Sequence, residues 1–565
     1  MKRLAVVRWP AAKTETLTAA QRPPADALGR DIDCPPPGLA VVALERARAP
    51  GIGAVTSGAV PEGTIDGELL PRFVATGSHD LEDWSMDAQE FRRHGYALID
   101  WLADYHATLA TRPVQPPTRP GDVRALLPAA PPDTPEPFAQ IIADLDRLVA
   151  PHLTHWQHPR FFGFFPGNAL LAGVLGDLAS TGLGVLGLSW QSAPAVTELE
   201  EVVTDWVRQM TGLSEAWRGV ISDTASTSTL VALISARERA TNYGLVRGGL
   251  QAEPRPLTAY VTEGSHSSVE KGALLAGFGR ENLRRVACDA AHAMRADALA
   301  AAVTADHAAG LQPCAVVATT GSTTTTAIDP VAAIARVAEA HGVWLHLDAA
   351  MAGSAMILPE CRWMWEGVEK ADSVVINAHK WLGAPFDCSL YYVRDHEHLV
   401  RVMSTNPSFL QSTVDDQVRN LRDWGIPLGR RFRALKLWFL IREQGISGLQ
   451  ARLRRDIANA RALAERVAVT PHWEVLAPVP LQTVCVRHEP AGLTGDALDH
   501  HTRTWAEAVN RSGVAYLTPA KLDGRWMVRV SVGAPDTQLA DVEAAWTAMR
   551  AEAESQAAEG ASHGR

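Results

Sequence analysis

The chain has 565 residues, 47% of them hydrophobic, and a formal net charge of −10. This length and composition allow a large buried core and two or three domains. The negative net charge and the lack of a long basic run argue against nucleic acid as a partner.

Six cysteines are scattered along the chain without a CxxC pair. This pattern is typical of a reduced, cytoplasmic protein and predicts neither a metal centre nor a disulfide framework. The apolar run near the N-terminus covers only residues 4–7, which is too short for a secretory signal. Two charge-free stretches, 161–176 and 178–197, are separated by Asp177, so we expect a buried core or a subunit interface there and no membrane span.

The N-terminal part of the chain divides into two segments. Residues 1–85 are rich in Pro, Ala and Gly with weak periodicity, which predicts a poorly ordered extension. Met86 then opens an amphipathic helical pattern, and a second helical stretch covers 138–149. We therefore expect a helical dimerisation segment over 86–165, and Met86 is a candidate for the true start of the protein.

Residues 166–455 are predicted to form a large α/β domain. The sequence Thr-Glu-Leu-Glu at 197–200 matches a capping box that would begin a helix. Another helix would be capped by Asp329 and end at Gly342, with Pro330 in its first turn. Short β-branched runs alternate with helical runs, which predicts a mostly parallel sheet. The predicted strands are 219–222, 258–262, 315–318, 343–347 and 373–376.

The pattern changes in the C-terminal part of the chain. A helix, a strand at 483–487, a helix at 494–510 and a β-rich pair within 515–532 precede a final helix. This order predicts a smaller α+β domain over 456–551, followed by a disordered tail over 552–565.

Two charged residues follow predicted strands at the edge where open α/β sheets build their sites. Strand 343–347 leads into Asp348, and strand 373–376 leads through His379 to Lys380. An aspartate can cap a turn, and a lysine can lie in a surface loop. A lysine flanked by Trp381 and an apolar strand, however, is rarely only solvated.

Two further features could contact a bound phosphate or a flat ring. Thr224, Ala225 and Ser226 precede a helical run, where backbone N–H groups can bind a phosphate. His266 follows the strand at 258–262 and could lie against a flat ring. Hydroxyl residues cap many helices, so neither feature is specific by itself.

Together these features match the requirements of pyridoxal 5'-phosphate (PLP). This cofactor needs a lysine for a Schiff base and an acid beneath its pyridine nitrogen. It also needs donors for its phosphate and a side chain packed on its ring. The lysine must be neutral to act as a nucleophile, which burial favours. The sequence therefore predicts a PLP site around Lys380, Asp348 and His266.

Over residues 86–551 the chain resembles the group II PLP-dependent decarboxylases, specifically the aromatic-L-amino-acid decarboxylase family. The resemblance is carried by His-Pro-Arg-Phe-Phe at 158–162, Leu-Asp-Ala-Ala at 347–350, His-Lys-Trp at 379–381 and Leu-Gly-Arg-Arg-Phe at 428–432. It implies the aminotransferase-like type I fold, with a mostly parallel seven-stranded central sheet and a smaller C-terminal α+β domain. It also implies a homodimer with active sites at the subunit interface.

The resemblance implies roles for individual residues. Lys380 would form the internal aldimine, Asp348 would pair with the pyridine nitrogen, and His266 would stack on the ring. Further cofactor contacts are expected from Thr224, Ala225, Ser226, Thr323, Ala350, Asn377 and His379. The aromatic substrate would meet an apolar pocket of Trp156, Phe164, Phe165 and Pro166, with Leu186 and Leu188 from the partner subunit.

One residue departs from the family pattern. The family carries a catalytic tyrosine on a mobile loop, and the aligned residue here is Phe409. After CO₂ is lost, a phenol can give Cα a proton, whereas phenylalanine has none to give. Some plant relatives with phenylalanine there resemble aldehyde synthases. We therefore predict decarboxylation of an aromatic amino acid to its amine, with aldehyde formation as the alternative; His266 or a water could also deliver the proton.

An aminotransferase is a more distant alternative. It would share the fold, Lys380 and Asp348, and would need an arginine for the substrate carboxylate, for which Arg529 is the obvious candidate in the small domain. A decarboxylase would instead leave the carboxylate in apolar surroundings, out of the ring plane. Gly167 and Gly429 offer no hydrogen bond to a ring hydroxyl, which favours tryptophan or phenylalanine among the aromatic substrates.

Overall fold

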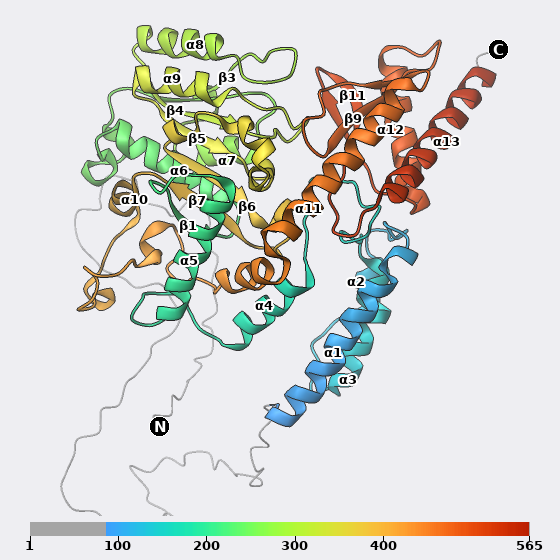
Figure 1. Ribbon diagram of the computed structural model, residues 1–565, viewed down its shortest axis with the longest axis horizontal. Coiled ribbons are helices and arrows are strands. Elements are labelled where there is room, and N and C mark those ends of the chain that lie inside the picture. Colours follow the sequence, from blue (N-terminus) through green and yellow to red (C-terminus); the bar gives the residue numbers. More distant parts are fainter. Residues whose placement is uncertain (1–85, 564–565) are drawn as a thin grey trace, which may run out of the picture. The chain divides into compact units, whose positions relative to one another are not determined.

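The computed structural model describes residues 86–563, apart from the side chains of Leu245, Phe409 and 559–563. The predicted extension over 1–85 lies outside the described residues. Met86–Arg565 form one compact unit, which contains two β-sheets (Figure 1). The predicted boundaries between its helical segment, large domain and small domain stay predictions.

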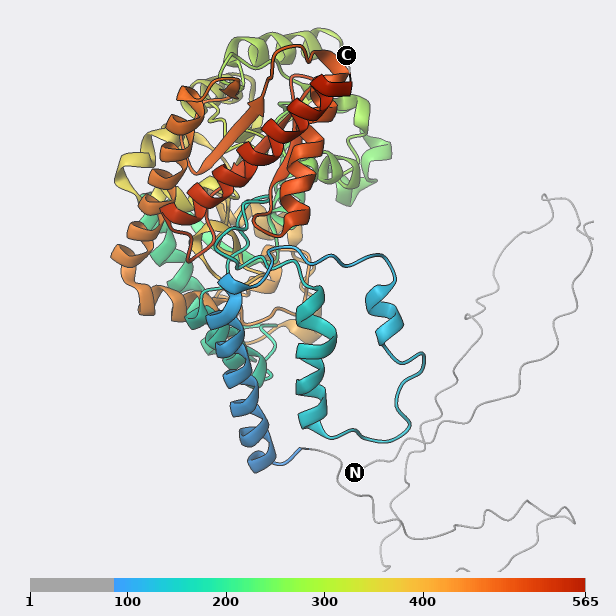
Figure 2. The same cartoon turned by 90° about the vertical axis from the view of Figure 1, so that its right-hand side faces the viewer.

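Five α-helices precede the first strand. They are α1 (Ala88–Thr108), α2 (Asp122–Leu126), α3 (Phe138–Asp144), α4 (Leu171–Gly182) and α5 (Pro194–Thr211). Helix α1 begins at a capping box, in which Asp87 accepts from the Glu90 backbone and Glu90 reaches back to the Asp87 backbone. It lies beside α3 (Figures 1 and 2). None of its residues is buried, so its apolar face, including Phe91 and Tyr96, stays exposed.

The central sheet has seven strands in the order β1-β7-β6-β5-β4-β2-β3. Their bounds are β1 (Arg218–Ser222), β2 (Leu257–Val261), β3 (Leu283–Arg285), β4 (Gln312–Thr319), β5 (Trp344–Asp348), β6 (Ser373–Asn377) and β7 (Ser389–Val393). Six of the strands run in one direction, and only β7 runs opposite to them. The mostly parallel seven-stranded sheet and all five predicted strands are confirmed, whereas β3 and β7 were not predicted.

The α-helices that follow α5 are α6 (Ala225–Ala240), α7 (Ser267–Leu275), α8 (Ala296–Ala308), α9 (Val331–His341), α10 (His396–Met403) and α11 (Ala434–Val469), before the second sheet. Helices cover both faces of the central sheet. Along β4, Val316 and Ala318 join a core cluster with α5, α8 and α9, whereas Ala315 and Val317 join another with α6 and α7. The alternation follows the two-residue period of a strand, and burial on both faces explains why the strands are continuous apolar runs.

Two predicted helix caps were wrong. Helix α5 begins at Pro194, so Thr197 lies inside it and its hydroxyl donates to the Ala193 carbonyl at 3.2 Å. Asp329 does not cap α9, because its carboxylate accepts from the backbone N–H groups of Met294 and Thr319, both at 2.7 Å. Each prediction assumed that the side chain accepts a hydrogen bond from the first turn of the helix that follows it, and in the structure each side chain has a different hydrogen-bond partner.

The second sheet is antiparallel, with the order β10-β11-β9-β8. Its strands are β8 (Trp473–Val475), β9 (Thr483–His488), β10 (Thr518–Leu522) and β11 (Arg525–Ser531), and helices α12 (Gly495–Ser512) and α13 (Leu539–His563) pack with it. The predicted strand, helix and β-pair are confirmed. The tail predicted over 552–565 was wrong for its described part, because α13 continues to His563 and Ala553 is fully buried. Among residues 86–563, no helix combines the length and apolar character needed to cross a bilayer.

Candidate active site

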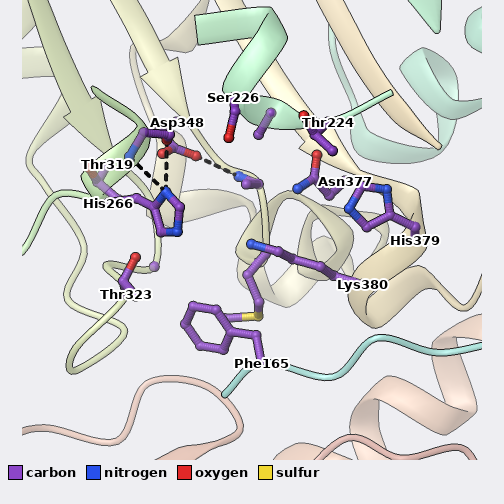
Figure 3. A pocket seen from close by; sticks show the side chains of 15 residues that line it. Phe165, Thr224, Ser226, His266, Thr319, Thr323, Asp348, Asn377, His379 and Lys380 are labelled. Carbon is purple, nitrogen blue, oxygen red and sulfur yellow. Dashed lines mark hydrogen bonds between the residues drawn. The ribbon is translucent and has the colours of Figure 1, made fainter. Parts of the chain in front are cut away.

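A cavity lies where strands of the central sheet end. Strands β4, β5 and β6 end in Thr319, Asp348 and Asn377, which all line it. Figure 3 shows the side chains that converge on this space. The full lining is Phe165, Thr224, Ala225, Ser226, His266, Ser268, Thr319, Gly321, Thr323, Asp348, Ala350, Met351, Asn377, His379 and Lys380.

All ten residues predicted to contact the cofactor are therefore in one cavity. Four lining residues were not predicted, namely Ser268, Thr319, Gly321 and Met351. The structure shows why position 321 is a glycine: its φ is +81°, and an added Cβ would lie 2.6 Å from the Cβ of Ala352. Only glycine adopts this conformation without strain, so the glycine itself is the one sequence signal for a close backbone approach in this loop.

Lys380 lies in a short helical turn, η11 (Ala378–Leu382), directly after β6. Two hydrogen bonds to residues of α11 fix this turn. The indole N–H of the fully buried Trp381 donates to Asp456 at 2.9 Å, and Arg452 donates to the Trp381 carbonyl at 2.6 Å. Burial lowers the pKa of the Lys380 amine, the charge of Arg529 lowers it further, and Asp348 opposes both. The site therefore favours the neutral amine that Schiff-base formation requires.

Asp348 and His266 lie together on one side of Lys380 (Figure 3). Asp348 is buried and accepts a hydrogen bond from the Ala350 backbone N–H at 3.0 Å. The Nδ1 atom of His266 accepts from the Ser268 backbone N–H at 3.1 Å, so the neutral ring carries its proton on Nε2. Burial and the charge of Lys380 lower the pKa of His266, and Asp348 opposes them. The cavity thus combines a fixed carboxylate with a neutral imidazole.

A group of hydrogen-bond donors lies on another side of the cavity. No side chain caps the N-terminus of α6, where Ala225 and Ser226 leave their backbone N–H groups for an anion. Asn377 accepts from the Ser389 hydroxyl at 2.6 Å through its oxygen, so its amide nitrogen stays available. His379 accepts the Cys388 N–H through Nδ1 at 2.9 Å, which leaves Nε2–H as a donor. Burial lowers the pKa of His379 to about 4, so the ring is neutral near pH 7.

Of the predicted substrate residues, the structure brings only Phe165 to the cavity of its own chain. Trp156 and Phe164 stack with ring centroids 5.4 Å apart, and each is more than 40% exposed. Leu186 is exposed, Leu188 is half-buried, and Pro166 packs near Gly533. The substrate roles of these five residues stay predictions.

The two glycines singled out for substrate size differ in their surroundings. A Cβ on Gly167 would lie 3.3 Å from the Trp156 ring, whereas nothing lies within 4 Å of one on Gly429. Only Gly429 therefore leaves open space. The backbone of Phe409 lies in a short turn, η12 (Ser408–Leu410), and its side chain is outside the description.

The residues that line this cavity fit PLP. The Lys380 amine, whose pKa is lowered, can bind the aldehyde, Asp348 can hold a proton on the pyridine nitrogen, and the uncapped α6 N-terminus suits the phosphate. When bound, PLP withdraws electrons from a bond at the substrate's Cα. Within residues 86–563, no group of three or more His, Cys, Asp or Glu residues could hold a metal ion.

Comparisons with known proteins agree with this chemistry. Residues 120–489 match the family described as "Pyridoxal-dependent decarboxylase conserved domain". Phenylacetaldehyde synthase of Arabidopsis thaliana is 38% identical over 83% of this chain and 96% of its own length. Aromatic-L-amino-acid decarboxylase of Bos taurus is 37% identical over 84% of this chain and 99% of its own length.

Solved structures give the same result. The crystal structure of Oryza sativa TDC with PLP and tryptamine superposes with a TM-score of 0.80 and 35% identity, over 83% of this chain and 99% of that chain. The structure of Rhodiola rosea 4-hydroxyphenylacetaldehyde synthase gives a TM-score of 0.78 and 32% identity, with the same coverage. The chain therefore belongs to the pyridoxal-dependent decarboxylase family and is a PLP-dependent carboxy-lyase.

Proposed function

We propose that this enzyme removes the carboxylate of an aromatic L-amino acid and releases the amine and CO₂. The observation that carries the proposal is a single cavity in which Lys380, Asp348 and an aromatic wall meet. That wall is the Phe165 ring, whose centroid lies 5.4 Å from Lys380 Nζ. Related proteins named tryptophan, tyrosine and aromatic-L-amino-acid decarboxylases support this substrate class.

Three residues of the cavity have separate roles in this proposed reaction. Lys380 would hold the cofactor and release it to the amino group of the substrate. Asp348 would keep a proton on the cofactor's ring nitrogen, and PLP would supply the acceptor for the electron pair of the broken bond. His266 carries a proton on Nε2 and is the described residue we assign to protonation of Cα, directly or through a water.

The test uses the purified holoenzyme with tryptophan, phenylalanine, tyrosine and dopa, each labelled at the carboxylate. We expect labelled CO₂ from at least one of them, and we expect borohydride to fix the cofactor to Lys380, as peptide mass mapping would show. The Lys380→Ala variant should release none. We expect the highest turnover with tryptophan or phenylalanine, because Gly429 faces open space and offers no hydrogen bond to a ring hydroxyl.

A second candidate is an aldehyde synthase, which Phe409 favours because phenylalanine cannot protonate Cα. Two similar proteins are named as aldehyde synthases. In this reaction the amino acid, O₂ and water give the aldehyde, CO₂, ammonia and hydrogen peroxide. Peroxide measured per CO₂ separates the two functions: about one per CO₂ indicates the synthase and none the decarboxylase. Phe409→Tyr should shift products toward the amine if this residue controls the outcome.

We also propose a homodimer whose partner completes the substrate pocket. On α4, Leu171, Leu175 and Leu178 lie at helical spacing and are each about half exposed. Trp156 and Leu186 add exposed apolar surface. Light scattering of the holoenzyme should give twice the chain mass, and Leu175→Glu should lower it. The unpaired cysteines among the described residues support the proposal of a cytoplasmic location, which cell fractionation would test.

A further inference from the structure

His266 directly precedes helix α7, and its ring nitrogen Nδ1 caps the start of that helix. Nδ1 accepts from the Ser268 backbone N–H at 3.1 Å, and the Ser268 hydroxyl lies closer still, with its Oγ 2.7 Å from the same atom (Figure 3). Ser268 is 6% exposed and lines the cofactor cavity. Two groups of one residue therefore meet a ring nitrogen that has a single lone pair.

The two groups differ in the states of the ring that they can bind. A backbone N–H only donates, so it pairs with Nδ1 only while that nitrogen carries no proton. A hydroxyl can donate or accept, because its hydrogen rotates. The Ser268 hydroxyl can therefore stay bonded to Nδ1 in both the neutral ring and the imidazolium.

Protonation of Cα by His266 requires the imidazolium. Loss of CO₂ leaves an electron pair on Cα, which must take up a proton to give the amine. A neutral imidazole is a very weak acid, so Nε2 releases its proton readily only when Nδ1 also carries one. The Nε2–H bond then breaks, its electron pair stays on the ring, and the Cα pair forms the new C–H bond. Water afterwards returns a proton to Nε2.

The surroundings of His266 make this second proton difficult to hold. Burial and the charge of Lys380 lower the pKa of the ring, and Asp348 opposes them. The positive N-terminal end of α7 also disfavours a charged ring beside it. The backbone N–H of Ser268 offers no acceptor to a protonated Nδ1, whereas the hydroxyl does. The hydroxyl is therefore the group at Nδ1 that makes the imidazolium accessible.

We propose that Ser268 is a positioning residue for proton delivery: its hydroxyl donates to Nδ1 of the neutral His266 ring and accepts from Nδ1–H of the imidazolium. The backbone N–H by itself holds the ring in place but stabilises only the neutral form. The hydroxyl thus sets how often the ring can give Cα a proton, and so how the product divides between amine and aldehyde. This inference rests on the proposed function.

The first test measures protonation of His266 without turnover. Diethyl pyrocarbonate acylates only an unprotonated imidazole, so peptide mass mapping of the full chain, before PLP is added, gives the acylation rate at residue 266 against pH. The midpoint for Ser268→Ala should lie about one pH unit or more below that of wild type, because the imidazolium loses a charged hydrogen bond. Ser268→Thr keeps a hydroxyl and should retain the wild-type midpoint.

The second test uses turnover by the holoenzyme. At pH 7.5, Ser268→Ala should form the amine about tenfold more slowly with KM nearly unchanged, and any peroxide per CO₂ should rise. The difference from wild type should shrink as the pH falls, because the imidazolium then forms in both proteins. Ser267→Ala is the matched control: it removes a hydroxyl from an exposed neighbour that does not line the cavity, and it should behave as wild type.

An unchanged acylation midpoint in Ser268→Ala, or a loss of rate that is the same at every pH, would overturn the proposal and leave Ser268 with a packing role alone. A Ser268→Thr variant that behaves like Ser268→Ala would do the same. If wild type releases no CO₂ from any aromatic amino acid, the proposed function fails, while the acylation midpoint still tests the hydrogen bond between Ser268 and His266.

Discussion

The buried ion pair between Glu200 and Arg430 should be a major source of stability for the region behind the active site. Glu200 is fully buried on α5, and its Oε1 accepts from the Ile221 backbone N–H at 2.7 Å and from Arg430 at 2.5 Å. Arg430 also donates to the Ile221 carbonyl at 2.8 Å. The pair therefore holds the end of β1, and with it the start of α6, against the segment before α11.

The variant Glu200→Gln keeps an acceptor but removes the negative charge, which leaves the Arg430 guanidinium buried without a counter-ion. Breaking a buried pair in this way costs about 3–5 kcal/mol. For the roughly 480 described residues, the unfolding entropy is about 1 kcal/mol/K, so the midpoint of thermal unfolding should fall by about 3–5 °C. The measurement is circular dichroism of the holoenzyme at pH 7.5.

A double variant makes the result interpretable. Glu200→Leu with Arg430→Met removes both charges, so its loss should be smaller than the sum of the two single losses. Raising the salt concentration should leave the effect of Glu200→Gln nearly unchanged, because buried pairs are weakly screened. A midpoint for Glu200→Gln within 1 °C of wild type, or strictly additive single losses, would refute the reasoning.

Three further variants or conditions follow from the described contacts. Asp348→Asn should lower kcat by roughly 10²–10³-fold because it removes the anion beneath the ring nitrogen; steady-state CO₂ release measures this, and wild-type kcat would contradict it. Gly321→Ala should weaken cofactor retention on dialysis, since its Cβ would meet Ala352 at 2.6 Å, whereas Gly342→Ala, also at positive φ but with nothing within 4 Å, should not; equal retention by both would count against this. Burial lowers the pKa of His346 and His488 from 6.5 to about 4, so the folded protein favours their neutral rings. That stabilisation is present above pH 6.5 and is lost as the pH falls toward 4, by about 1.4 kcal/mol per unit for each ring; a midpoint constant from pH 7 to 5 would contradict it.

The chain itself predicts the sheet and the cofactor site because both depend on local signals. Strands covered on both faces are short apolar runs between turn residues, and such runs can be recognised from their composition. Asp348 and Lys380 follow two of these runs, and parallel strands place their ends at one edge of the sheet. The pairing of β7 could not be predicted, because an antiparallel strand within a parallel sheet is set by its neighbours in space.

Contacts between distant parts of the chain decide the remaining features. Asp329 looks like a helix cap, but folding brings the Met294 backbone N–H to its carboxylate. Arg529 has no sequence neighbour that would place it near Lys380, and only the packing of β11 beside the cavity does so. Trp156, Phe164 and Leu186 lie on surface that this chain leaves exposed, so contacts within one chain do not place them in a pocket. Local secondary structure follows from residue type and period, whereas contacts between residues far apart in the sequence are decided by how the elements pack.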